Sequence, residues 1–323
     1  MIKVRGLTKT FNVKGFEIPA VRGVDLDVAP GEIVGFLGPN GAGKTTTLRM
    51  LSTLLTPTSG EAIVAGCDLL TDQDGVRQRI GYVGQGSGAG PEYRVAEELV
   101  THGRLYGLSS VESKERVSSL LKRFDLEGAE DKMIGALSGG QKRRLDIVMG
   151  VMHRPQLVFL DEPSTGLDPH SRSNLWDHVR AMREQDGTTV FLTTHYLDEA
   201  DALCDRILVI DAGAIVAEGT ADELKQKVNG DLVSVESSSP EVAAEVAAKA
   251  PGAGEIVVEG PVVRFRIPRG DSALPGLLRD FDQAGVVVQS IQTNRPTLDD
   301  VFLTLTGRSL RDTDAATPMP AFQ

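Results

Sequence analysis

Short apolar runs alternate with longer helical patterns over about residues 1–225, which predicts an α/β domain with a largely parallel sheet. The clearest strand patterns are Glu32–Leu37, Arg79–Val83, Leu157–Leu160, Thr188–Thr193 and Arg206–Ile210. Continuous apolar runs such as LVFL and ILVI are typical of strands that are buried on both faces. The early segments alternate apolar and polar residues more regularly, which predicts an antiparallel β part, and residues 97–121 predict a mainly helical block.

The pattern changes after Leu224, where strand and helix patterns follow one another in the order βαββαβ. The predicted strands are 231–237, 254–260, 261–267 and 286–292, and the predicted helices are 240–250 and 272–285. This order is that of a ferredoxin-like split βαβ unit. We therefore expect a first domain at 1–225, a small α+β domain at 226–306 that ends in an amphipathic helix, and a disordered tail at 307–323.

Composition narrows the class of protein. The 323 residues carry 34 basic and 45 acidic side chains, a formal charge of −11, which argues against generic binding to nucleic acid. The two cysteines, Cys67 and Cys204, have no metal-ligand spacing, which argues against a zinc module and fits a reducing compartment. No apolar run approaches the ~20 residues that cross a bilayer, so we expect any membrane role to come through a partner.

A glycine-rich turn stands between the strand pattern EIVGFL and the helix pattern TTTLRMLSTLL, and it fits the phosphate-binding motif GxxxxGK[ST]. Its backbone N–H groups can point at phosphate oxygens, and the helix N-terminus adds a positive dipole. We expect Lys44 to reach the β- and γ-phosphates and the Thr45 hydroxyl to bind Mg²⁺. A turn that merely precedes a helix is the alternative. The predicted site comprises Gly38, Pro39, Asn40, Gly41, Ala42, Gly43, Lys44, Thr45 and Thr46.

Four polar side chains stand at the ends of other predicted strands. Asp161 and Glu162 end the run LVFLDEP, and the carboxyl edge of such a sheet is where ligands bind. We expect Asp161 to hold Mg²⁺ through water and Glu162 to act as general base on the attacking water. A solvated acidic turn is the alternative interpretation. His195 is placed to reach the γ-phosphate and Gln85 to contact Mg²⁺ and the attacking water, although each alone is a weak signal.

The sequence LSGGQ at 137–141 begins a second helical pattern. A serine can cap a helix, and glycines permit the close approach of another molecule, so this turn is a second candidate anion site; a plain helix cap is an equally open alternative. Because the first turn already encloses one set of phosphates, two chains facing head to tail would let each turn close on the partner's nucleotide. The predicted residues of this seam are Ser138, Gly139, Gly140, Gln141 and Asp168.

These motifs resemble, in order and spacing, those of ABC transporter ATP-binding subunits, and TLDDVFLTLTGR resembles the C-terminal extension of the daunorubicin/doxorubicin resistance group. The resemblance implies a P-loop NTPase fold: a RecA-like core, an antiparallel β subdomain and a helical subdomain that carries LSGGQ. It implies that ATP and Mg²⁺ are enclosed between two subunits of a homodimer. Hydrolysis would drive a membrane permease on a separate chain, with this subunit peripheral at the cytoplasmic face of the cell membrane.

The same resemblance implies efflux of a drug or antibiotic-like hydrophobic compound, and an aromatic side chain that stacks on adenine. Phe11 is the best-placed match and Phe16 the competitor, and either could instead be a core residue. The sequence departs from the family pattern in the glycine-rich segment GSGAGPEYR after Gln85 and in the long turn NVKGFEIPA. The small C-terminal domain is expected to be a dimerisation or regulatory module, with a small-molecule sensor as the alternative.

Two other functions remain open: export of a lipid or polysaccharide, and a soluble ABC-type ATPase that acts on nucleic acid or ribosomes. Relatives that act on DNA ends split the nucleotide domain with a long coiled coil, whereas Lys44 and Leu137 are 93 positions apart with no heptad run between them. Ribosome-acting types generally carry two nucleotide domains, and this chain has one phosphate motif. The only compact basic run near the site, residues 142–144, is expected to be a solvated helix face, so we expect no nucleic-acid partner.

Overall fold

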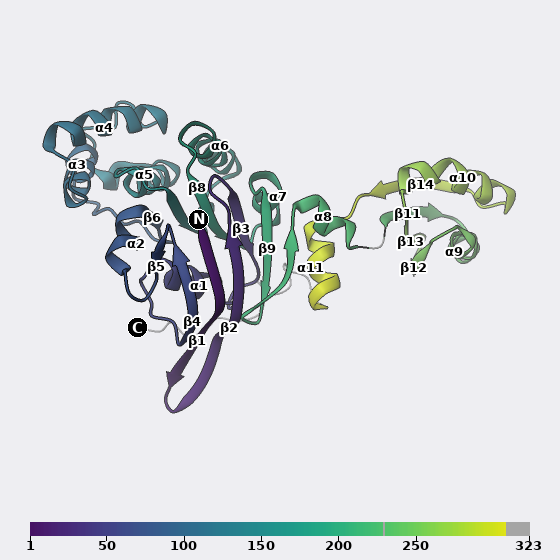
Figure 1. Ribbon diagram of the computed structural model, residues 1–323. Coiled ribbons are helices and arrows are strands. Elements are labelled where there is room, and N and C mark those ends of the chain that lie inside the picture. The colour runs from purple at the N-terminus through teal and green to yellow at the C-terminus, as the bar shows by residue number, and fades with distance from the viewer. Residues whose placement is uncertain (229, 308–323) are drawn as a thin grey trace. The chain divides into compact units, whose positions relative to one another are not determined.

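The computed structural model describes residues 1–228 and 230–307, which divide into two compact units, 1–221 and 222–307 (Figure 1). Each unit is described by itself below. The predicted tail lies, from residue 308 onward, outside the described residues. No helix in the described part of the chain is both long and apolar enough to cross a membrane.

A six-stranded sheet forms the centre of the first unit, with the strand order β10-β9-β3-β8-β7-β6. All neighbours are parallel except the pair of β9 and β10. The strands are β3 (Ile33–Leu37), β6 (Ile80–Val83), β7 (Leu157–Asp161), β8 (Thr189–Thr194), β9 (Arg206–Asp211) and β10 (Ala214–Gly219). The five predicted strands of this sheet are confirmed, each within one residue at either end.

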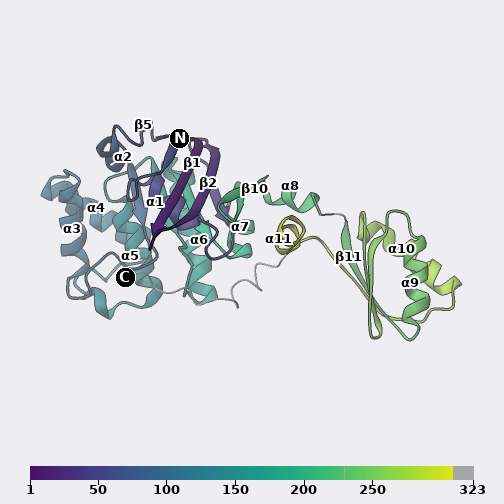
Figure 2. The ribbon, with the colours of Figure 1, turned by 90° about the horizontal axis from the view of Figure 1, so that it is seen from below.

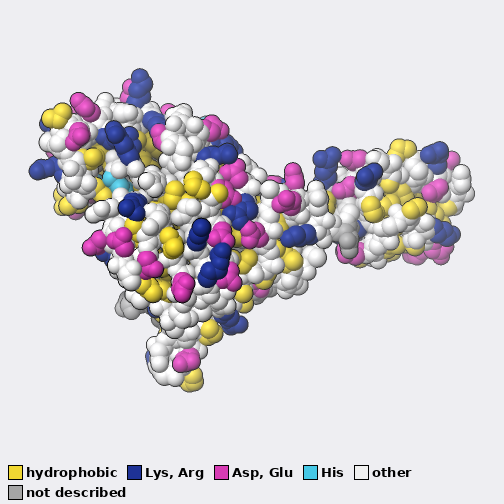
Figure 3. Space-filling model, viewed as in Figure 1, with side chains coloured by type: hydrophobic (Ala, Val, Ile, Leu, Met, Phe, Trp, Pro, Cys, Tyr) yellow, Lys and Arg dark blue, Asp and Glu magenta, His cyan; other side chains and the backbone are white. Residues whose placement is uncertain are grey.

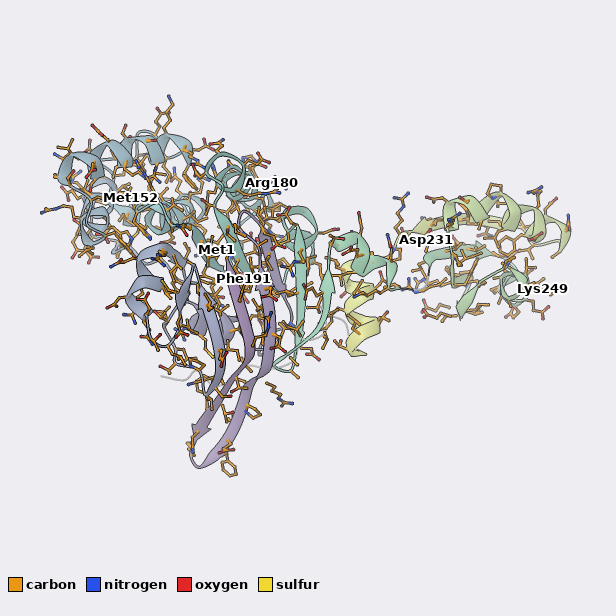
Figure 4. The ribbon with its side chains drawn as sticks, viewed as in Figure 1. Met1, Met152, Arg180, Phe191, Asp231 and Lys249 are labelled. Carbon is orange, nitrogen blue, oxygen red and sulfur yellow. The ribbon has the colours of Figure 1, made fainter. Side chains whose placement is uncertain are left out.

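Burial on both faces explains why these strands read as continuous apolar runs. Every residue of β3, β7 and β8 is buried. Phe191 lies on β8 in the interior of the unit (Figure 4). Its ring centroid is 5.6 Å from that of Phe36 on β3 and 5.9 Å from that of Phe159 on β7, so two aromatic contacts join three neighbouring strands. This packing fixes the strand ends that carry the candidate site.

The predicted antiparallel part is a four-stranded sheet with the order β2-β1-β4-β5. Its strands are β1 (Ile2–Val13), β2 (Phe16–Val28), β4 (Ser59–Val64) and β5 (Cys67–Asp68). The β1–β2 hairpin extends beyond the other strands of this unit (Figure 1). Buried and exposed residues alternate along much of β1 and β2, as expected of a sheet with one face on the core.

Helices complete the first unit. The predicted helical block consists of α3 (Val95–Leu105) and α4 (Ser110–Arg123), which lie next to each other (Figure 1). A capping box between Ser109 and Glu112 starts α4. The remaining helices are α1 (Lys44–Leu51), α2 (Gln73–Arg79), the 3₁₀ turn Ile134–Ala136, α5 (Gly139–Val151), α6 (Pro169–Asp186) and α7 (Leu197–Leu203).

The second unit confirms the predicted βαββαβ order. After α8 (Ala221–Gln226) come β11 (Asp231–Ser237), α9 (Pro240–Lys249), β12 (Gly254–Glu259), β13 (Val262–Ile267), α10 (Gly270–Gln283), β14 (Val288–Asn294) and α11 (Leu298–Thr306). The sheet is antiparallel with the order β12-β13-β11-β14, and α9 and α10 pack on the same side of it (Figure 2). This is the ferredoxin-like arrangement.

Two elements of this unit differ from the prediction by two residues at both ends: α10 was expected at 272–285 and β14 at 286–292. The last strand was expected from residue 286, but β14 begins at Val288. Gly285 adopts a left-handed φ of +73° after α10, and the Val286 N–H donates to the Phe281 carbonyl at 2.9 Å. Val286 therefore closes the helix end and packs into the core instead of joining the sheet.

Candidate functional site

The phosphate turn joins β3 to α1, and its glycines are required by local geometry. Gly41 and Gly43 have φ values of +80° and +104°, in the left-handed region that favours glycine. A Cβ atom added at Gly38 would lie 2.3 Å from the Ile210 carbonyl oxygen of β9. The backbone can therefore curl closely over the start of α1, where backbone N–H groups and the helix dipole favour an anion.

Lys44 is the first residue of α1, and its side chain is only 4 % exposed. The ammonium donates hydrogen bonds to the carbonyl oxygens of Gly38 at 2.7 Å and Pro39 at 3.1 Å. It also lies 3.4 Å from Glu162 Oε1. The turn thus holds a buried positive charge at its centre, as charge compensation of phosphate groups requires.

Asp161 ends β7 and is buried between two hydroxyl groups. Its Oδ1 accepts hydrogen bonds from Thr45 Oγ1 at 3.0 Å and from Thr193 Oγ1 of β8 at 2.6 Å. Burial raises the pKa of Asp161 above its usual value, and the two hydroxyl groups oppose this shift. Thr193 was not singled out from the sequence, because it lies inside an apolar strand pattern. The signal that could have identified it is a polar residue in that strand, two positions before His195.

Glu162 follows directly with a left-handed φ of +46°, an uncommon conformation for a residue other than glycine. Its amide donates to Thr193 Oγ1 at 3.0 Å, and its Oε2 lies 3.4 Å from His195 Nδ1. Burial raises the pKa of Glu162, but His195 and Lys44 together outweigh burial, so the pKa is lowered overall. The carboxylate is therefore ionised at neutral pH and able to accept a proton.

Gln85 completes this group from the loop after β6, where its Nε2 donates to Thr45 Oγ1 at 3.3 Å. Since β3, β8, β7 and β6 are neighbours in that order, their carboxyl ends form a single row of polar groups. Direct contacts bring together six of the residues that the sequence singled out: Lys44, Thr45, Gln85, Asp161, Glu162 and His195.

The other candidate turn starts α5. Ser138 caps this helix through a reciprocal capping box with Gln141, with hydrogen bonds of 3.3 and 3.0 Å. A Cβ atom added at Gly140 would lie 2.8 Å from Ser171 Oγ of α6, whereas Gly139 has open space around it. Asp168 caps α6 by accepting hydrogen bonds from the amide and the hydroxyl of Ser171. The starts of α5 and α6 thus form a second polar group.

The two candidate aromatic residues differ in position. Phe16 is 75 % exposed beside the tip of the β1–β2 hairpin, whereas Phe11 is partly buried, with Lys9 Nζ 5.3 Å from its ring. The phosphate turn contacts the hairpin at Ala20, whose carbonyl oxygen would lie 2.6 Å from a Cβ atom added at Gly43. Phe11 pairs with the residue two positions before Ala20, so it is the aromatic nearer to the turn along the hairpin.

Comparisons with known proteins agree with this geometry. Residues 21–165 match the family model described as ABC transporter, and residues 219–306 match the C-terminal domain described as ATP-binding protein DrrA1-3-like. The daunorubicin resistance ATP-binding protein DrrA3 of Streptomyces coeruleorubidus is 43% identical over 317 residues, which is 98% of each chain. The Nod factor export ATP-binding protein I of Cupriavidus metallidurans is 39% identical, covering 90% of this chain and 94% of its own. The chain is an ATP-binding protein of the ABC transporter family.

A solved structure supports the same conclusion for the first unit. The dimeric post-hydrolysis state of an ATP-binding cassette bound to ADP and Pi has a TM-score of 0.63 and 28% sequence identity, covering 68% of this chain and 98% of that one. The predicted P-loop NTPase fold and the resemblance to the daunorubicin/doxorubicin resistance group are confirmed. The protein is therefore a nucleotide-binding ATPase.

The donor set of this ABC ATPase fits a nucleotide and a divalent ion. The curled turn supplies N–H groups and the buried Lys44, while Thr45 and Asp161 supply a hydroxyl and a carboxylate. Among the described residues, no group of three or more His, Cys, Asp or Glu side chains could hold a metal by protein ligands alone. An ion at Thr45 would thus need water and phosphate oxygens as further ligands, which is how Mg²⁺ is usually bound in ATPases.

The structure corrects one expectation about the ATPase unit. Residues 142–144 do not form a solvated face: Lys142 and Arg144 are partly exposed, but Arg143 is buried with three backbone carbonyl groups around its guanidinium. Helical rotation explains the difference, because successive residues turn by about 100° and the middle one faces inward. A second buried charge on α5, Asp146, was also missed by sequence reasoning. Its signal was an acidic residue among the apolar positions of a helix.

Proposed function

We propose that this ATPase energises the export of a drug or antibiotic-like hydrophobic compound through a permease formed by a separate chain, at the cytoplasmic face of the cell membrane. The observation that carries this proposal is the extent of the likeness to the daunorubicin resistance protein, which spans both units and not the ATP-binding unit alone. The separate match of residues 219–306 supports the same group. The absence of a membrane-spanning helix among the described residues is compatible with a permease on another chain.

In the proposed reaction, the ionised Glu162 accepts a proton from the water that attacks the γ-phosphate. The buried ammonium of Lys44 stabilises the charge of the phosphates, and His195 holds the carboxylate and reaches the same phosphate. Thr45 and Asp161 would hold Mg²⁺, which would supply charge compensation to the phosphates. Gln85 donates a hydrogen bond to the Thr45 hydroxyl and is proposed to orient the water.

We infer that the complete site is shared by two copies of the chain. The N-terminus of α5 presents Ser138 and the open Gly139 at the surface, as an anion site requires. Asp168 lies at the neighbouring start of α6 and is exposed, which suits a residue at the seam. The dimeric state of the solved ADP- and Pi-bound relative supports this arrangement. Phe11, the nearer aromatic, is proposed to stack on adenine.

A cleft of about 550 Å³ beside the Gln85 loop is the proposed docking site of the permease. It lies between β6 and the helices α3 and α5, and its lining includes Tyr82, Gly86, Glu98, Tyr106 and Met149. A cytoplasmic segment that inserts a side chain into this cleft would lie beside the loop that carries Gln85. Docking could thereby be sensed at the catalytic water.

The small unit at 222–307 is proposed to be a dimerisation or regulatory domain. Its core is apolar, formed by residues such as Val233, Phe265 and Phe281. All residues proposed to bind ATP precede this unit. It is therefore expected to affect assembly or control and not the chemistry of hydrolysis.

The Glu162→Gln variant tests the shared catalytic site. Loss of the carboxylate should lower the turnover of ATP about 10²–10⁴-fold, because no base remains to accept the proton. ATP should still bind, and the variant should accumulate as an ATP-bound dimer in size-exclusion chromatography with light scattering. The exposed Glu92→Gln on the loop before α3 is the matched control. A Glu162→Gln variant that binds ATP but stays monomeric at saturating ATP and Mg²⁺ would contradict the shared site.

Export of a lipid or polysaccharide is the second candidate, favoured by the 39% identity to a Nod factor export protein. Membrane vesicles that contain the permease would distinguish drug export from export of a lipid or polysaccharide. The transported compound should stimulate ATP hydrolysis or accumulate in inverted vesicles. A role on nucleic acid is disfavoured by the net charge of −11. On the face of the first unit drawn in Figure 3, Lys and Arg are interspersed with Asp and Glu.

A further inference from the structure

Two buried charged side chains on α5 have partners that surround the catalytic residues. Arg143 and Asp146 are each only 7 % exposed. Being three positions apart, they lie on the same face of the helix. Burial lowers the pKa of Arg143 and raises that of Asp146, because desolvation disfavours the charged form of each side chain.

Arg143 connects two loops of the active site. Its guanidinium donates hydrogen bonds to the carbonyl oxygens of Gly84 at 2.6 Å, Asp161 at 3.0 Å and Pro163 at 2.8 Å. Gly84 lies directly before the glutamine of the β6 loop, and the other two residues flank Glu162. One planar side chain therefore fixes the backbone on both sides of the general base and at the entry to the glutamine loop.

Asp146 holds the other end of the same loop. Its Oδ1 accepts a hydrogen bond from Ser87 Oγ at 3.0 Å and from the Gly88 amide at 3.1 Å. The segment Gly84–Gly88 contains three glycines, whose wide backbone freedom would otherwise leave the glutamine poorly placed. Together Arg143 and Asp146 hold both ends of this segment on one helix.

We propose that Arg143 and Asp146 are positioning residues for Gln85. By holding both ends of its loop, they keep the Gln85 amide against the Thr45 hydroxyl. Because α5 also begins with the Ser138 turn, the same two residues connect the glutamine loop to the helix that carries that turn. The inference rests on the proposed role of Gln85 in hydrolysis, but it is independent of the exported compound and of the dimer.

Hydrogen–deuterium exchange of the full-length protein without nucleotide tests the positioning directly. In the Asp146→Ala variant, amides in the peptide 84–90 should exchange about tenfold faster or more, since the Gly88 amide loses its acceptor. Asp146→Asn retains an oxygen acceptor and should restore protection. Leu145→Ala, which removes a buried apolar side chain from the same helix, is the matched control and should leave this peptide unchanged.

ATPase kinetics supply the second measurement. Asp146→Ala should lower kcat about 10–100-fold and raise the Mg²⁺ concentration for half-maximal activity, while KM for ATP changes less than about twofold. Ser87 is exposed, so Ser87→Ala should not impair folding. This variant should change kcat and the Mg²⁺ dependence in the same directions, each by about threefold. A purely structural role would reduce the folded fraction without moving the Mg²⁺ dependence.

The results separate this inference from the proposed function. Unchanged exchange in the peptide 84–90 of Asp146→Ala, or faster exchange with wild-type kcat and Mg²⁺ dependence in both Asp146→Ala and Ser87→Ala, would overturn the positioning role. If Glu162→Gln hydrolyses ATP normally, the assignment of the general base fails, but the exchange experiment still decides whether the loop is held as described.

Discussion

The two units of this protein differ in what they bury. Among its described residues, the first unit buries fourteen polar or charged side chains, whereas the second buries only Ser237. The apolar cores of both units are otherwise similar in kind, with fully buried phenylalanine residues such as Phe191 and Phe265. Since an unpaired buried polar group is destabilising, the first unit retains these groups against a stability cost that the second unit avoids.

Several of the buried polar groups of the first unit lie at the candidate site or next to it. Besides the residues at the strand ends, Ser164 hydrogen-bonds to Glu199 of α7, and Trp176 Nε1 donates to both at 3.1 Å. Ser164 follows Glu162, the proposed general base, by two positions, so this network continues from the candidate site into the loop that leads to Asp168. Burial raises the pKa of Glu199. Buried polarity therefore marks the functional unit more clearly than fold or composition does.

The largest effect is expected at the centre of the phosphate turn. Lys44→Ala removes the buried ammonium and should reduce ATP hydrolysis by more than about 10³-fold, to the background of the assay. A malachite-green phosphate assay measures the loss. Lys114→Ala on the exposed face of α4 is the control and should retain wild-type turnover. Near-normal hydrolysis by Lys44→Ala would mean that the phosphates bind elsewhere.

The sequence predicted the parts of this site that are local in the chain. The turn at Gly38–Thr45 and the pair Asp161–Glu162 are contiguous and directly follow strands, so the strand pattern alone places them on one sheet edge. The predicted start of the last strand at Val286 was wrong, because an apolar residue can close the end of a helix as well as begin a strand. Such choices depend on hydrogen bonds that the residue pattern does not record.

Contacts between distant segments were not predictable in the same way. Arg143 reaches Gly84 across 59 positions, and Thr193 reaches Asp161 across 32. Nothing in a helix pattern says which loop will face a given turn of the helix, because that depends on how α5 packs on the sheet. A basic run was therefore interpreted as solvated, although its middle residue is buried. Local motifs indicate the candidate catalytic groups, whereas tertiary packing decides which other residues contact them.

A core substitution should distinguish the units by its consequence for function. Phe265 is fully buried on β13, and Phe265→Ala should destabilise the second unit by about 3–5 kcal/mol. Amide exchange across β11 and β13 should rise accordingly, while the affinity for ATP stays within about twofold. Trp176, the only tryptophan of the chain, reports on the first unit and should keep its native fluorescence.

The matched control is Phe191→Ala, which removes the same side chain from β8 at the centre of the first unit. This variant should lose both ATP affinity and native Trp176 fluorescence. If Phe265→Ala instead lost ATP affinity while Trp176 remained native, the second unit would have to contribute to the nucleotide site.

The smallest effect concerns acid stability, which should also differ between the units. His153 lies after α5, with its Nε2 2.9 Å from the Ile80 carbonyl oxygen and its ring stacked 3.8 Å from that of Tyr106. Burial lowers the pKa of His153 to about 4, against a usual value of about 6.5. Between these two pH values, His153 binds a proton in the unfolded chain but not in the folded chain. The free energy of unfolding should therefore fall as pH decreases from about 6.5 toward 4.

Denaturant titrations followed by Trp176 fluorescence should show this loss in the first unit between pH 7.5 and 5. His153→Gln cannot titrate, so its loss over that range should be smaller by roughly 1 kcal/mol, a value reduced from the full shift because the ring is partly exposed. In the second unit, salt-bridged Asp300 has a lowered pKa, whose stabilising contribution is lost only at pH values below about 4. Equal acid sensitivity of both units above pH 5 would show that buried ionisable groups do not set the difference between them.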